Sequence, residues 1–139
     1  MVKKWIIITV IFVCLIIGCA LEYNYVNKAF VGLRENLEAF EPMLSANEEN
    51  IDTEENIKYV ENLHASWHKK VKVLKALIWH TGLKDIEVGL SKIKTYTEEN
   101  AYTEALAELQ SLIDYVNHYA KDFTLAIENL LMPLGLKRF

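Results

Sequence analysis

Residues 5–21, WIIITVIFVCLIIGCAL, form an almost purely apolar run near the start of this 139-residue chain. The run carries no charge, and its one strong hydrogen-bonding side chain is the hydroxyl of Thr9. Eleven of its residues are Ile, Leu, Val or Phe, which together favour insertion into a bilayer by about 3 to 7 kcal/mol. The sequence therefore predicts that the rest of the chain is held beside a membrane.

The run fits a retained membrane anchor over residues 5–25. As a helix this segment would span about 30 Å, close to the hydrocarbon thickness of a bilayer. Trp5 at one end and Tyr23 and Tyr25 at the other are typical of the aromatic belts at membrane interfaces.

Two cleaved alternatives stay open. Gly18-Cys19-Ala20 supplies small residues at the position where a signal peptide is cut. Ile16-Ile17-Gly18-Cys19 is also a loose lipobox, in which Cys19 would receive a lipid. We favour the anchor, because the apolar periodicity continues after the run where a lipoprotein would have a Gly/Ser-rich tether.

Charge predicts the orientation and the class of the remaining domain. Only Lys3 and Lys4 precede the run, so residues 1–4 are expected to stay cytoplasmic and residues 26–139 to be extracytoplasmic. From residue 22 onward, 13 basic residues face 19 acidic ones, which argues against nucleic acid as a partner. Both cysteines lie in the apolar run, so the domain must be stabilised by packing alone.

The periodicity after the run is helical, with apolar steps of four and three as in a coiled coil. The first predicted helix buries Val26, Phe30, Leu33, Leu37, Phe40 and Leu44. The second buries Ile57, Val60, His64, Trp67, Val71, Leu74 and Ile78. The third buries Leu83, Ile86, Leu90 and Ile93, and the fourth Tyr102, Leu106, Leu109, Ile113, Val116, Ala120 and Phe123. A last short helix is expected over Thr124 to Leu131.

Residues with strong local preferences predict where these helices end. Pro42 is expected to end the first helix near Glu41, and Asp52 with Glu55 to cap the second. We expect Gly82 to cap the end of the second helix and Asn100 to cap the start of the fourth. The short connections predict an all-α fold, in which a single transmembrane helix continues into a small antiparallel bundle.

Two polar clusters on the second helix suggest binding chemistry. Glu61, His64 and His68 share one helical face at a spacing that suits zinc or a di-iron site. His64 lies in the apolar row of the second helix, where a hydrogen-bonded core histidine is the simpler explanation. A di-iron site would also need acidic residues in the buried rows of the other helices, and those rows are apolar. We therefore expect no metal.

The lysines at positions 69, 70, 72 and 75 suit anionic headgroups or wall polymers, with Trp67 and Trp79 as anchors. A solvated face that balances the acidic stretch from Glu35 to Glu61 is the simpler explanation, and we favour it.

The chain contains no catalytic signature. It lacks G-x-S-x-G, a P-loop, H-E-x-x-H and a phosphate-binding glycine loop. Its carboxylates are spread along polar helix faces, without two that the sequence would pair for acid–base chemistry. We therefore expect a protein that is not an enzyme and needs no cofactor.

The stretch over residues 67–116, together with the two-lysine start and the apolar helix, resembles an uncharacterised family of spore-forming Gram-positive bacteria, domain of unknown function 4363. The residues that carry the resemblance are the Trp67-His68 pair, His80 ahead of a short acidic helix, and the A-L-A-E-L run over residues 105–109. The resemblance implies a single-pass membrane protein without an assigned activity. It supports the anchor over the lipobox and supplies no catalytic residues.

We therefore predict a membrane-anchored interaction or accessory module that acts by helix–helix recognition. Its contact surfaces are expected on the first helix and in the apolar tail Leu130 to Leu136, with a protein partner or a second copy. The first-helix residues are Phe30, Leu33, Leu37 and Phe40. Ordinary bundle packing is the simpler explanation of both surfaces. The alternative function is a small-ligand or metal sensor with His64 at the wall of a polar cavity.

Overall fold

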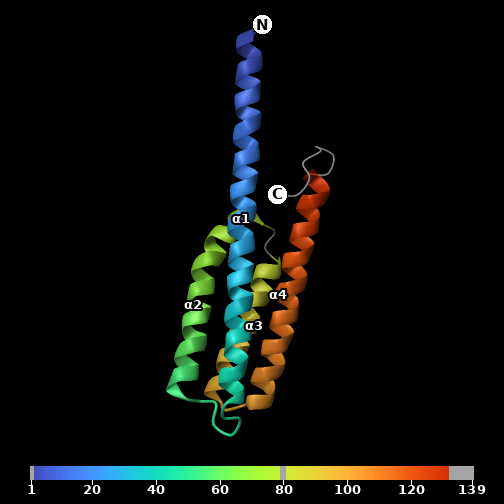
Figure 1. Ribbon diagram of the computed structural model, residues 1–139. Coiled ribbons are helices and arrows are strands. Elements are labelled where there is room, and N and C mark those ends of the chain that lie inside the picture. The colour runs from blue at the N-terminus through green and yellow to red at the C-terminus, as the bar shows by residue number, and fades with distance from the viewer. Residues whose placement is uncertain (1, 79–80, 132–139) are drawn as a thin grey trace.

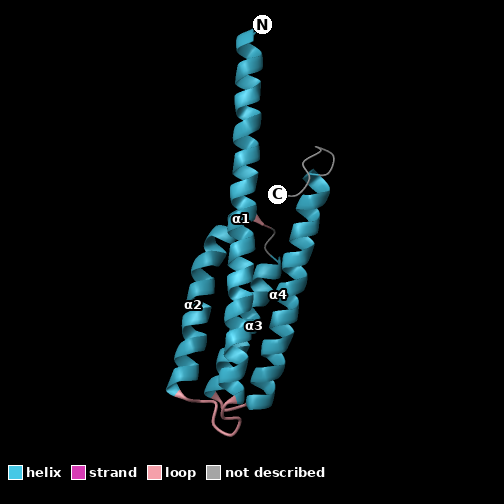
Figure 2. Cartoon of the chain, viewed as in Figure 1, coloured by secondary structure: helices cyan, strands magenta, loops and turns pink. Residues whose placement is uncertain are grey.

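The computed structural model describes residues 2–78 and 81–131, with side chains for residues 3–78 and 82–122. Four helices make up this part of the chain (Figure 1): α1 (Val2–Ser45), α2 (Glu54–Leu77), α3 (Thr81–Glu98) and α4 (Tyr102–Leu131). No strand occurs among the described residues (Figure 2). The all-α prediction is confirmed.

The helices form an up-and-down bundle, from which the N-terminal half of α1 projects (Figure 1). α1 packs between α2 and α4, and α3 packs between the same two helices on the opposite side. The first buried side chain of α1 is Val26, and residues 3–25 before it are exposed except Gly18 and Tyr23, which are half-buried. The predicted antiparallel bundle on a long N-terminal helix is confirmed.

Four rows of side chains, one from each helix, build the core. In α1 and α3 all the predicted residues are buried, from Val26 to Leu44 and from Leu83 to Ile93, and Ala29 and Thr97 are buried in addition. The row on α2 contains Leu63 in place of His64, and Ile57 is only half-buried. The row on α4 consists of Ala105, Leu109, Leu112 and Val116. The predicted rows on α2 and α4 were therefore wrong at several positions.

α1 continues one turn past the residue where Pro42 was expected to end it. Pro42 lies inside the helix, and the N–H of Ala46 still donates to the Pro42 carbonyl at 3.0 Å. The ring removes one hydrogen bond, but the extra turn places Leu44 fully inside the core. Burial of a leucine, at about 1.5–3 kcal/mol, is of the same order as the cost of about 3 kcal/mol for a proline inside a helix.

The N-cap of α2 lies one residue later than predicted. Thr53 is its N-cap, with a hydroxyl that accepts the N–H of Asn56 at 3.2 Å, so the prediction of Asp52 with Glu55 was wrong. The Asn56 side chain is buried and donates to the carbonyl of Ile51 at 3.0 Å. The loop thereby folds back on the helix and places Ile51 in the core.

α2 also ends earlier than predicted, at Leu77, with extended Ile78 after it. Gly82 is not a cap, because it lies in the first turn of α3 against the ring of Tyr119. That ring stacks on Phe30 with the ring centroids 5.1 Å apart. Gly82 is needed here for close approach of α3 to α4, and not for a left-handed turn.

Asn100 ends α3 instead of starting α4. Its φ of 55° is left-handed, and the Ala101 N–H reaches back to the carbonyl of Tyr96 at 2.8 Å, as in a Schellman motif. The Asn100 side chain accepts the N–H of Ile51 at 2.7 Å and donates to the carbonyl of Glu49 at 2.9 Å. One residue therefore caps α3 and joins the two loops at the far end of the bundle.

α4 runs without a break from Tyr102 to Leu131, so the prediction of a separate short helix from Thr124 was wrong. The sequence around Thr124 contains neither proline nor glycine, and the chain has no local reason to leave the helix there.

Candidate functional site

The N-terminal part of α1 has the most apolar exposed surface of the described chain. The large apolar side chains from Trp5 to Leu21 are between 40% and 67% exposed. This is the one described helix that is long and apolar enough to cross a membrane, a test that a signal sequence also passes. The hydroxyl of Thr9 donates to the carbonyl of Trp5 at 2.9 Å, so the single strongly polar side chain is satisfied within the helix.

Both cysteines, Cys14 and Cys19, are unpaired and exposed on this part of α1. Cys19 lies within continuous helix, with the bundle beginning seven residues later at Val26. Lipidation of Cys19 and cleavage of a signal peptide stay open as alternatives. The boundary between an anchor over residues 5–25 and a domain over residues 26–139 stays a prediction.

The four first-helix residues predicted as a contact surface lie in the core. Phe30, Leu33, Leu37 and Phe40 are at most 2% exposed, because α2 and α4 cover that face of α1. Their burial favours ordinary bundle packing over a surface open to a partner. The second predicted surface, Leu130 to Leu136, lies outside the described side chains.

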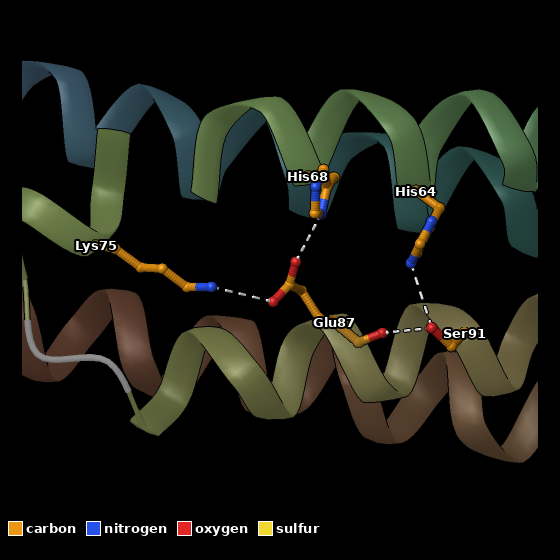
Figure 3. Close-up of polar contacts among 5 residues, drawn as sticks. All are labelled: His64, His68, Lys75, Glu87 and Ser91. Atoms are coloured by element: carbon orange, nitrogen blue, oxygen red, sulfur yellow. Dashed lines mark hydrogen bonds and ion pairs between the residues drawn. The ribbon is translucent and has the colours of Figure 1, made fainter. Parts of the chain in front are cut away.

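A polar ladder follows the exposed edge between α2 and α3. Each of the three candidate metal ligands on α2 meets a different residue of α3 (Figure 3 shows His64 and His68). Glu61 contacts Lys94 at 3.0 Å, His64 Nε2 lies 3.2 Å from Ser91 Oγ, and His68 Nδ1 lies 3.0 Å from Glu87 Oε1.

This geometry does not bring a metal site together. In the described part of the chain, no three His, Cys, Asp or Glu side chains gather where they could hold a metal ion. Glu61 instead pairs with an ammonium group, and the hydrogen bond to Glu61 together with its charge raises the pKa of Lys94. A cation bound at Glu61 would have to displace that ammonium group, so the ladder fits a structural contact between two helices.

The alternative function, a small-ligand or metal sensor, requires a polar cavity between the buried rows of the four helices. The buried described side chains are apolar except Asn56 and Thr97, and both form hydrogen bonds to backbone carbonyls. A shallow hollow of about 460 Å³ lies outside the seams, lined by residues of α3 alone, among them Lys84, Glu87 and Tyr96. His64 is half-buried on the polar edge. The structure therefore offers little support for a ligand inside the bundle.

Three of the four lysines of the basic cluster on α2 are exposed and Lys70 is half-buried. Trp67 is 1% exposed and packs edge-on against Phe30 with ring centroids 5.6 Å apart, which confirms its place in the predicted core row and rules it out as a lipid anchor. Trp79 and His80 lie outside the described residues. Among the four lysines, Lys75 alone forms an ion pair with a described residue, Glu87, at 3.7 Å.

Comparison with known proteins identifies a family for this chain. The profile of the family described as Domain of unknown function (DUF4363) matches residues 20–130, which include the whole bundle and the end of the apolar run. No curated protein and no solved structure matches the chain.

Proposed function

We propose that this chain, which belongs to the DUF4363 family, is a membrane-anchored accessory protein that recognises another membrane helix through α1. In this proposal the N-terminus is cytoplasmic, residues 5–25 cross the bilayer, and the bundle is extracytoplasmic. Lys3 and Lys4, which precede the apolar run, support that orientation. The chain would act by holding or recruiting a partner, without catalysis, cofactor or nucleic acid.

One observation carries the proposal, namely where the exposed apolar surface lies. Beyond Tyr25, the large apolar side chains that are exposed among the described residues are Val73 on α2 and Val88 on α3. The apolar rows of the four helices pack against one another in the core, so they offer no groove to an amphipathic helix of a partner. The apolar face of α1 ahead of the bundle is still uncovered.

Helix–helix recognition through α1 would take place within the bilayer. Lipid tails are as apolar as leucine, so association there depends on close packing and not on burial from water. A partner would therefore recognise the shape of α1, including the small side chains at Cys14 and Gly18. Gly18 has open space around it in the described structure, which leaves room for a neighbouring helix.

In-membrane cross-linking of the full chain, followed by mass spectrometry, tests this proposal. The matched control replaces residues 5–21 with an unrelated apolar helix of equal length and leaves the bundle unchanged. We expect the native chain to capture a reproducible integral-membrane protein, or a second copy, and the replaced chain to lose it. Equal capture by both chains would assign recognition to the bundle and overturn the proposal.

The native cysteines separate a partner from a second copy. Mild oxidation in the membrane would cross-link two copies through Cys14 or Cys19 if their α1 helices pack together. A chain with Cys14→Ser and Cys19→Ser is the control. Disulfide-linked dimers that disappear in this control would identify a homo-oligomer.

A further inference from the structure

Seven lysines, contributed by all four helices, surround the end of the bundle from which the apolar part of α1 emerges. We call them the lysine rim: Lys28 of α1, Lys69, Lys70, Lys72 and Lys75 of α2, Lys84 of α3, and Lys121 of α4. Six of the seven are exposed, and Lys70 is half-buried near Gly32 of α1.

Contacts between the helices fix the height of the rim. Phe30 of α1 is level with Trp67 of α2 and with Tyr119 of α4, because their rings are in contact. His68 of α2 is level with Glu87 of α3, because they share a hydrogen bond. Every rim residue lies on the membrane side of these contacts, since α2 and α4 rise toward the apolar run and α1 and α3 descend from it.

The rim lies close to the expected membrane surface. At about 1.5 Å per helical residue, all seven Cα atoms are within roughly 6 Å of the level of Tyr25, the last residue of the proposed span. That distance is shorter than the Debye length of about 8 Å in physiological salt. The charges are therefore near enough to act on headgroups.

Charge is also separated along the bundle axis. Four described carboxylates lie at the level of the rim: Glu22, Asp85, Glu87 and Asp122. Asp85 accepts a hydrogen bond from Tyr115, and Glu87 contacts His68 and Lys75. Seven positive charges thus face four negative ones. The outer end, residues 46–58 and 97–104, has the opposite balance, with eight acidic residues and one basic residue.

We propose that the lysine rim binds the anionic phospholipid headgroups of the membrane that α1 crosses. The inference rests on the proposed anchoring by α1. Because α1 runs as one helix from the apolar run into the core, the rim cannot turn away from the bilayer. The acidic outer end would be repelled by the same surface, so both charged ends favour a bundle that stands upright on the membrane.

The test measures lipid selectivity of the full chain reconstituted in vesicles. Spin-labelled phosphatidylglycerol and phosphatidylcholine report, by electron paramagnetic resonance, how strongly the chain prefers the anionic lipid. The rim variant carries Lys69→Gln, Lys72→Gln and Lys84→Gln, three exposed lysines that have no ion pair among the described residues. The matched control carries Lys58→Gln, Lys92→Gln and Lys94→Gln, which remove the same charge further from the membrane.

We expect the preference for phosphatidylglycerol to fall at least about threefold in the rim variant and to change little in the control. Raising the salt to 0.5 M should remove most of the preference in the native chain. Equal effects of the two triple variants, or no effect of the rim variant, would overturn the proposal. If the rim variant does not fold, a preference in the native chain that is insensitive to salt would also overturn it.

Failure of the anchoring itself has a different signature. A chain held by its lysines alone would be released from floated vesicles by 0.5 M salt, whereas an anchored chain would stay with them. A chain that floats but shows no rim effect would retain the anchor and contradict the rim alone.

Discussion

Asn100 combines a backbone role and a side-chain role, and substitution can separate them. Asn100→Gly keeps the left-handed conformation but loses the hydrogen bonds to Ile51 and Glu49, at a cost of about 1–2 kcal/mol. Asn100→Ala loses both bonds and adds strain, at about 2–4 kcal/mol. We expect the free energy of unfolding to be highest for the native chain, lower for Asn100→Gly and lowest for Asn100→Ala. Urea unfolding of the full chain in detergent, monitored by circular dichroism, measures this order. Equal losses would mean that the backbone conformation contributes nothing.

Two glycines on helices predict opposite effects of one added methyl group. Gly82→Ala would push Cβ into the ring of Tyr119, which is held in a stack on Phe30, and should destabilise the bundle by about 1–3 kcal/mol. Gly32→Ala meets only Lys70 Nζ at 3.9 Å and should stabilise α1 by about 0.5–1 kcal/mol. Thermal unfolding of the two variants should therefore shift the midpoint in opposite directions. A gain of stability in Gly82→Ala would contradict the close approach of α3 and α4.

Tyr115 predicts how the bundle responds to alkaline pH. Burial raises the pKa of Tyr115, and the hydrogen bond to Asp85 and the charge of that carboxylate raise it further. The unfolded chain loses this phenolic proton near pH 10, before the folded chain does, so stability falls as pH rises above about 10. Tyr115→Phe should lower stability at pH 7 by about 0.5–1.5 kcal/mol and make the alkaline loss smaller. Urea midpoints measured at pH 7 and pH 11 check both effects, and an unchanged alkaline loss would contradict this assignment.

At the scale of elements, sequence periodicity predicted α1 and α3 well because their apolar residues lie on one narrow face. On α2 the choice between Leu63 and His64 could not be made from spacing, since both positions fit steps of three and four from Val60. The structure buries Leu63 and leaves His64 at the polar edge beside Ser91. α4 is apolar over a wider face, so its packing against α1 and α3 decides which of its apolar residues are buried.

This register can be tested on two adjacent residues. Leu63→Ala should destabilise the bundle by about 2–4 kcal/mol, because Leu63 is 8% exposed and its removal leaves a cavity. His64→Ala should cost no more than about 1 kcal/mol, since it removes one hydrogen bond at an exposed edge. Urea unfolding of both variants gives the comparison. A larger loss of stability in His64→Ala than in Leu63→Ala would indicate that His64 is the buried residue, as the sequence alone predicted.

The ends of the elements were harder to predict, because tertiary contacts decide them. Pro42 stays inside α1 because Leu44 gains a place in the core. The Asn100 side chain bonds to a loop that is distant in the sequence, so no local pattern predicted its role.

At the scale of the molecule, the sequence predicted an apolar helix joined to a bundle and the basic cluster on α2. It did not predict the lysine rim, because Lys28, Lys84 and Lys121 come from three other helices. Alternating helix direction brings them to the same end of the bundle. The predicted contact residues on α1 are buried in the core for a related reason, since spacing shows that a face is apolar but not whether the chain covers it itself.

The unbroken course of α1 predicts that the whole bundle stands at a fixed height above the membrane. Ser45 lies 20 residues beyond Tyr25, the end of the proposed span, so the outer end should be held about 30 Å from the membrane boundary. A fluorophore on Asn47→Cys, in a chain with Cys14→Ser and Cys19→Ser, reports this distance by energy transfer to labelled headgroups.

Two insertions after Tyr25, between the proposed span and the first core residue Val26, test whether α1 is the cause of this fixed height. Seven helix-forming residues should move the fluorophore about 10 Å further out, because they add two turns and nearly preserve the helical phase. Seven Gly/Ser residues should give a broad distribution of distances, because they break the rigid connection. They should also reduce the preference for anionic lipid, since the rim is then free to leave the surface. If the native chain shows the same broad distribution as the Gly/Ser variant, α1 bends at the membrane, and the bundle is tethered without being oriented.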